Sequence, residues 1–145
     1  MVAPKLTREE LQIFLAAEFP QMFGADGGLS IEHVEHAACR VRQAFHPQFL
    51  RPGGTISGVV MMGLADVSMY MAVLASIGRV PLAVTTNLSI NFLRKPSQQD
   101  LIAECRLLKL GKRLAVGEVT IRSHGADEPV AHAVTTYSIP AQSDT

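Results

Sequence analysis

The segment Ser57–Ile77, with the sequence SGVVMMGLADVSMYMAVLASI, decides the fold. It contains twenty-one residues and a single charged side chain, Asp66, near its middle. A helix that is hydrophobic on nearly every side is buried either in the centre of a protein or in a membrane. About 20 apolar residues suffice to span a bilayer, but Gly63, Asp66, Ser68 and Tyr70 dilute this segment. We therefore expect a buried central helix with other elements wrapped around it.

The segments on both sides of this helix alternate apolar and polar residues, which is typical of strands. Two strands are expected between Leu29 and Phe45. Four more are expected at Val84–Phe92, Leu101–Lys109, Arg113–His124 and Pro129–Ile139. Short turn-rich connections separate these four, so we expect an antiparallel meander. The prediction is an α+β fold, with an antiparallel sheet of about six strands wrapped around one long helix.

The length of the chain fits one compact domain, so residues 1–145 are interpreted as a single domain. Near the start, Thr7 can cap a helix that is expected at about residues 7–19 and ends before Pro20. Residues 141–145 are expected to form a loose tail.

Charge and cysteine usage exclude several classes of protein. Thirteen Lys and Arg balance thirteen Asp and Glu, which argues against nucleic-acid binding and against a basic membrane-surface protein. Cys39 and Cys105 have no CxxC spacing, and no signal-peptide pattern opens the chain, so we expect buried free thiols in a cytoplasmic protein. His33, Glu35 and His36 alternate along an expected strand. Neither a metal site nor a cofactor is therefore expected.

Asp66 is the first candidate for chemistry, because a carboxylate inside an apolar helix is costly to bury. A nearby hydroxyl or backbone group could satisfy it structurally, or a reaction could need it. The run Gly53–Gly58, GGTISG, lets the backbone approach closely at the helix start. Free N–H groups at a helix N-terminus can stabilise an oxyanion.

Three motifs in order, GGTISGVVMMGLAD, TTNLSINFLRKP and LKLGKRLAVGEVTI, resemble the acyl-CoA thioesterases of the phenylacetic-acid-degradation (PaaI-like) group, which have the hotdog fold. The resemblance covers roughly Leu29–Ile139. It implies that Asp66 is the catalytic carboxylate and that the N–H of Gly58 polarises the thioester carbonyl. It also places Thr85 near the attacking water and Arg51 in the loop before the helix. Finally, it implies a homo-oligomer in which Asp66 of one chain serves a thioester at Gly58 of another.

The chain departs from the family pattern at the helix start. The family usually reads His-Gly-Gly, and this chain reads Ser57, Gly58 and Val59. Ser57 either donates a weaker hydrogen bond to the substrate or only caps the helix. Arg51, in place of an amide side chain, is a second departure. The nearest upstream histidine, His46, is interpreted as structural.

Cations at strand ends or turns are candidates for contacts with the phosphates of CoA, and the alternative is that they are merely solvated. They are Arg94, Lys95, Lys112 and Arg113.

The leading hypothesis is a thioesterase that hydrolyses a small aryl or a short- to medium-chain acyl-CoA. Asp66 would act as base or nucleophile, and the amide of Gly58 would stabilise the oxyanion. The alternatives are a non-catalytic acyl-CoA-binding hotdog protein and, less favoured, a hotdog hydratase, because no histidine follows Asp66 within its helix. The expected assembly is a homodimer, or a tetramer built as a dimer of dimers.

Overall fold

The computed structural model describes residues 2–141. Most of the tail that the sequence predicted therefore lies outside the described residues. The described chain forms three α-helices, six strands and one short 3₁₀ turn at Pro47–Phe49. The helices are α1 (Arg8–Glu18), α2 (Pro20–Phe23) and α3 (Gly58–Ile77), and the strands are β1 (Leu29–Glu35), β2 (Ala38–Gln43), β3 (Val84–Phe92), β4 (Leu101–Leu110), β5 (Leu114–Ser123) and β6 (Pro129–Ser138).

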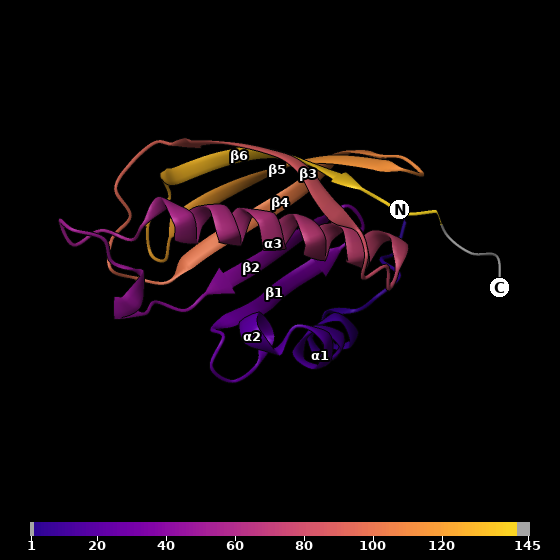
Figure 1. The fold of residues 1–145 in the computed structure, drawn as a ribbon, viewed down its shortest axis with the longest axis horizontal. Coiled ribbons are helices and arrows are strands. Elements are labelled where there is room, and N and C mark those ends of the chain that lie inside the picture. Colours follow the sequence, from indigo (N-terminus) through magenta and orange to yellow (C-terminus); the bar gives the residue numbers. More distant parts are fainter. Residues whose placement is uncertain (1, 142–145) are drawn as a thin grey trace.

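The strands form one antiparallel sheet in the order β1-β2-β4-β5-β6-β3, and α3 runs along one face of it (Figure 1). The helix α1 packs against β1 and α3. Its N-terminus is the predicted one, because the hydroxyl of Thr7 accepts a hydrogen bond from the N–H of Glu10 and the Glu10 carboxylate bonds back to the N–H of Thr7. The hotdog arrangement predicted from the sequence, a sheet wrapped around a long central helix, is confirmed.

The predicted four-strand meander is wrong in one connection. β4, β5 and β6 do follow one another in the sheet, but β3 pairs with β6 and not with β4. The link of residues 93–100 is too long for a tight hairpin turn. When extended, the link can span about 25 Å. β3 lies three strand positions from β4, a distance of about 14 Å, so the link is long enough to connect them. The link therefore crosses beside the N-terminal end of α3, which leaves β3 at the edge of the sheet (Figure 1).

The helix α3 is the centre of the hydrophobic core. Twelve of its twenty residues are buried, including Leu64, Met69 and Leu74. By length and composition it could cross a membrane, but 61% of its most apolar window is covered by the rest of the fold. Gly117 of β5 allows the close approach of helix and sheet, since a Cβ atom there would lie 2.7 Å from the sulfur of Met69. The expectation of a buried central helix is confirmed.

The two cysteines are buried and free, as the sequence predicted. Cys39 of β2 and Cys105 of β4 face each other across the sheet. The neighbouring thiol and the burial together raise the pKa of Cys39 well above its usual value. The thiol of Cys39 is therefore protonated and unreactive at neutral pH.

Candidate active site

Asp66 lies half-buried in the middle of α3, where two hydroxyl groups bind its carboxylate. The hydroxyl of Thr85 on β3 donates a hydrogen bond to Oδ1. The hydroxyl of Tyr137 on β6 lies 3.0 Å from the same oxygen and 3.1 Å from the main-chain carbonyl oxygen of Asp66. No hydrogen bond to Oδ2 is found among residues 2–141. One carboxylate oxygen is thus anchored, and the other is available to a water molecule or a substrate.

Tyr137 is a site residue that sequence reasoning missed. It is only 4% exposed, and burial raises the pKa of its phenol far above the usual value, so the hydroxyl remains a donor. The ring of Tyr70 stacks on it with 6.2 Å between centroids, while the Tyr70 hydroxyl donates to the carbonyl oxygen of Pro81 at 3.0 Å. The sequence contains a hint of this role. The side chains of β6 that point into the core are apolar except for Thr135 and Tyr137, which carry hydroxyl groups.

The N-terminus of α3 provides the second part of the site. Ser57 caps the helix, since its hydroxyl accepts from the N–H of Val60 at 3.4 Å. The capping role that the sequence allowed for Ser57 is therefore observed, and the proton of the hydroxyl is not used by this bond. Gly58 follows, and its N–H has no acceptor among the described residues. A Cβ atom at Gly58 would lie 2.9 Å from the ring of Phe92, so a side chain at this position would have to displace the half-exposed ring.

A cavity of about 460 Å³ lies beside this helix end. It brings together Gly58 with three of the predicted binding residues, Arg51, Arg94 and Lys95. Arg94 is already engaged, because its guanidinium pairs with Glu128 at 2.8 Å and donates to the carbonyl oxygen of residue 129 at 2.8 Å. Arg51 and Lys95 form no ion pair within residues 2–141, so they are the cations that remain available here.

Lys112 and Arg113 are not brought into this cavity. They line a separate cavity near Ile77, at the other end of α3. A helix of this length spans about 30 Å. Within one chain, these two cations therefore cannot bind a group that is held at Gly58.

Gly58 and Asp66 are also apart within one chain. Eight residues of α-helix correspond to a rise of about 12 Å, which is too far for both groups to act on one thioester. The edge beside them is open, since β3 pairs on one side only within the described structure. Exposed apolar side chains accompany this edge, with Val84 53% and Phe92 50% exposed on β3 and Val59 78% exposed on α3.

Comparison with known proteins gives the family. The family model described as the thioesterase superfamily matches residues 53–130, which is more than half of the chain. This chain belongs to the thioesterase superfamily. The matched part contains α3 with both Gly58 and Asp66, as well as β3 with Thr85.

Individual relatives agree with this assignment. A crystal structure from Silicibacter sp. TM1040, provisionally named a thioesterase, is 46% identical, with a TM-score of 0.85 and 94% of each chain covered. A curated protein of Saccharolobus solfataricus, provisionally named an esterase, is 30% identical over 64% of this chain and 61% of its own length. The chain thus spans less than two thirds of the curated relatives it matches. The phenylacetic acid degradation protein PaaI of Thermus thermophilus, in the structure of a mutant, shares the fold at 22% identity, with a TM-score of 0.68 and coverage of 78% of this chain and 94% of that one.

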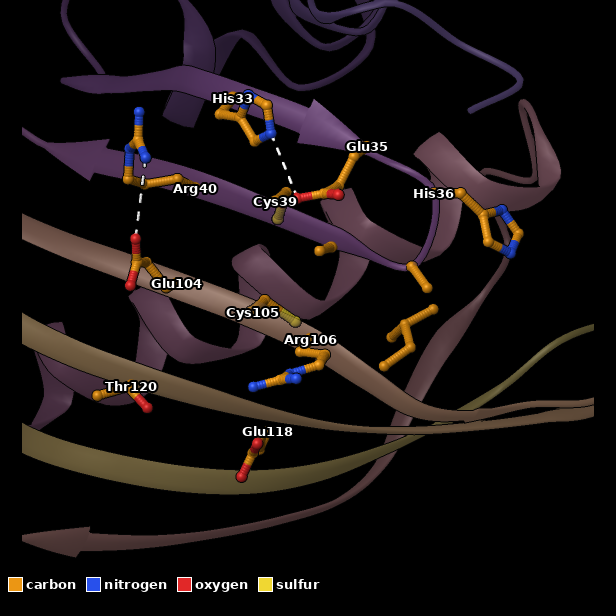
Figure 2. A pocket seen from close by; sticks show the side chains of 13 residues that line it. His33, Glu35, His36, Cys39, Arg40, Glu104, Cys105, Arg106, Glu118 and Thr120 are labelled. Carbon is orange, nitrogen blue, oxygen red and sulfur yellow. Dashed lines mark hydrogen bonds and ion pairs between the residues drawn. The ribbon is translucent and has the colours of Figure 1, made fainter. Parts of the chain in front are cut away.

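The sheet of this thioesterase-superfamily chain carries a second hollow on the face away from α3 (Figure 2). It has a volume of about 590 Å³ and side chains of both charges. His33 contacts Glu35 at 3.3 Å and Arg40 contacts Glu104 at 3.8 Å. Within residues 2–141, no group of three or more His, Cys, Asp or Glu side chains could hold a metal ion.

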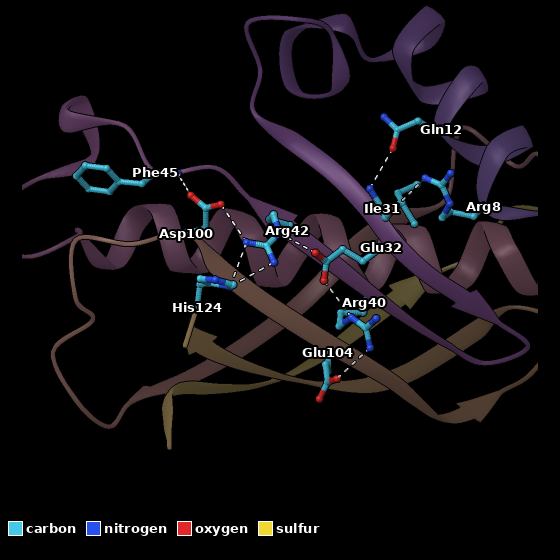
Figure 3. A network of polar contacts seen from close by, with 10 residues as sticks. All are labelled: Arg8, Gln12, Ile31, Glu32, Arg40, Arg42, Phe45, Asp100, Glu104 and His124. Carbon is cyan, nitrogen blue, oxygen red and sulfur yellow. Dashed lines mark hydrogen bonds and ion pairs between the residues drawn. The ribbon is translucent and has the colours of Figure 1, made fainter. Parts of the chain in front are cut away.

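A network of ion pairs joins the strands on the same face (Figure 3). The guanidinium of Arg42 on β2 contacts Glu32 of β1 at 2.6 Å and Asp100, which precedes β4, at 3.0 Å. The N–H of Phe45 also donates to Asp100 at 2.7 Å, and this bond, followed by the Arg42 contact, lowers the pKa of Asp100. These contacts connect neighbouring strands far from Asp66, so we interpret them as structural. His46 also has a local role, because its Nδ1 accepts from the N–H of Gln48 at 3.0 Å.

Proposed function

We propose that this protein is an acyl-CoA thioesterase that hydrolyses a small aryl or a short- to medium-chain acyl-CoA to the free acid and CoA. The observation that carries the proposal is the carboxylate of Asp66, which has one anchored and one unoccupied oxygen on the central helix of a thioesterase-superfamily fold. The unbonded N–H of Gly58 at the start of the same helix supplies the second requirement, a donor for an oxyanion.

The reaction follows from these two groups. The thioester carbonyl oxygen accepts a hydrogen bond from the N–H of Gly58, which favours attack at the carbonyl carbon. Asp66 removes a proton from a water molecule that attacks this carbon, or its carboxylate attacks directly and water then opens the acyl-enzyme. The C–S bond breaks in either route, CoA leaves as the thiolate and is protonated, and the acid is released.

The proposed site needs two copies of the chain. Since Gly58 and Asp66 lie about 12 Å apart along one helix, Asp66 of one subunit serves a thioester bound at Gly58 of the other. In a two-fold dimer the same contact occurs twice, so each dimer contains two sites. The open edge of β3 and the exposed Val84 and Val59 support an assembly on this side, with a dimer of dimers as the larger form.

Contacts with CoA are assigned to the cations. Arg51 and Lys95 are available beside Gly58, whereas Arg94 is paired with Glu128. Lys112 lies at the other end of α3, so it would meet a phosphate of a substrate only from the second subunit. Such exposed cations hold the substrate and the transition state alike, so they contribute to KM more than to kcat.

The test is the release of free thiol from a panel of aryl and straight-chain acyl-CoAs, with calorimetric binding measured in parallel. The proposal predicts turnover of at least one small acyl-CoA. One observation favours an alternative, a non-catalytic acyl-CoA-binding protein: residues 57–59 at the helix start include no histidine. Binding of acyl-CoA without release of thiol would establish that alternative.

A further inference from the structure

Tyr137 places its hydroxyl between two oxygens of one residue, the carboxylate Oδ1 and the main-chain oxygen of Asp66, at 3.0 and 3.1 Å. The phenol has a single proton, which it shares between these two acceptors. Its ring is buried on β6, a strand with neighbours on both sides. The hydroxyl is therefore held by the core of the sheet and not by a mobile surface segment.

We propose that Tyr137 positions Asp66 for reaction, by fixing Oδ1 so that Oδ2 is the oxygen that meets water or the thioester. This inference rests on the proposed function, because it assumes that Asp66 reacts. It adds which oxygen acts and which residue holds the carboxylate.

The sheet register supports this role. Thr85 and Tyr137 are direct cross-strand partners, so their side chains project from the same face of the sheet, side by side. Both donate to Oδ1, one from the edge strand β3 and one from the inner strand β6. The terminal torsion of an aspartate is broad and poorly fixed by itself. Two donors that arrive at one oxygen from different strands remove this freedom.

The titratable side chains beside Asp66 are Tyr137 from β6 and Tyr70 from α3 itself. Burial raises the pKa of both phenols, so they stay neutral across the working range. Tyr70 donates to Pro81 and not to the carboxylate. Of the two phenols, only Tyr137 therefore holds the carboxylate.

The experiment compares Tyr137→Phe with Tyr70→Phe as a matched control. Both variants keep the stacked rings and lose one hydroxyl. In Tyr137→Phe we expect kcat to fall about tenfold with KM nearly unchanged, which is the scale of one hydrogen bond to a charged group. In Tyr70→Phe both constants should stay at their parental values. An unchanged kcat in Tyr137→Phe would overturn the inference.

A second measurement does not depend on activity. The chain has two tyrosines, so 3-fluorotyrosine incorporated into the Tyr70→Phe variant labels Tyr137 alone. We expect its ¹⁹F resonance to move when Asp66→Asn is added. A resonance that Asp66→Asn leaves in place refutes the contact, even if Tyr137→Phe does not fold. If the resonance moves and no acyl-CoA is hydrolysed, the proposed function fails while the contact stands.

Discussion

Replacement of Asp66 by asparagine is the sharpest perturbation of the proposed chemistry. Asparagine keeps the size of the side chain and an acceptor at Oδ1, so the hydroxyls of Thr85 and Tyr137 keep a partner. The substitution removes the base or nucleophile at the other oxygen. A positioned general base contributes about 10²- to 10⁴-fold to the rate, equivalent to roughly 3–5 kcal/mol of activation free energy. We expect kcat to fall at least about a hundredfold.

The effect on stability should be small, and this separates a catalytic from a structural carboxylate. The two hydrogen bonds to Oδ1 weaken when their acceptor becomes neutral, by less than about 1 kcal/mol each. The half-buried charge disappears, which offsets this loss. The free energy of unfolding should therefore stay level or rise slightly.

The assay measures thiol release, acyl-CoA binding and thermal unfolding for Asp66→Asn and for a control. Glu118→Gln is a suitable control, because Glu118 is a half-buried carboxylate that pairs with His132 at 3.1 Å, away from the site. Parental turnover in Asp66→Asn would refute the catalytic assignment. A variant that no longer folds would show that the carboxylate is structural.

Three further predictions concern assembly, CoA binding and acid stability. Light scattering should find at least a dimer at micromolar concentration, and Val84→Asp, at the exposed edge of β3, should lower both the mass and the activity. Lys95→Ala and Lys112→Ala should each raise KM with little change in kcat, and the rise in KM should be smaller at high salt. An unchanged KM would show that these two side chains do not contact CoA. Asp100→Asn should lower the free energy of unfolding by about 1 kcal/mol at pH 7. The N–H of Phe45 depresses the folded pKa of Asp100, so this stabilisation is present above the unfolded pKa and is lost as the pH falls through the folded one. In acid unfolding curves, the difference between wild type and Asp100→Asn should shrink as the pH falls below the ordinary pKa of an aspartate, and vanish once the folded carboxyl is protonated.

The elements of this fold could be predicted because their signals are local. The expected strand Val84–Phe92 matches β3, and the strand expected at Leu101–Lys109 is one residue longer in the structure. Alternation and turn residues act over a few positions, so a single sequence reveals them. The order of strands depends on the path of the link at residues 93–100, and that path follows from packing against the start of α3. No local pattern encodes it.

The candidate site could be predicted only where a local sequence signal marks its residues. Asp66 stands out as the one charge in an apolar helix, and the resemblance carried Thr85 with it. Tyr137 contacts Asp66 across 71 positions of sequence, so only the folded sheet brings them together. The placement of the cations also depends on the whole fold, since Lys95 and Lys112 lie at opposite ends of α3.

Gly63 connects the helix geometry to the proposed assembly. A glycine inside a helix costs about 1 kcal/mol relative to alanine, and within this chain nothing lies within 4 Å of a Cβ atom built there. Packing inside one subunit therefore does not explain why position 63 is a glycine. A two-fold axis that places Gly58 of one copy beside Asp66 of the other passes beside position 62, midway between them. There two copies of α3 would cross beside Gly63, and a missing side chain lets helix backbones approach closely. In such a dimer, Gly58 of each subunit would therefore lie beside Asp66 of the other, although the two residues are far apart within one chain.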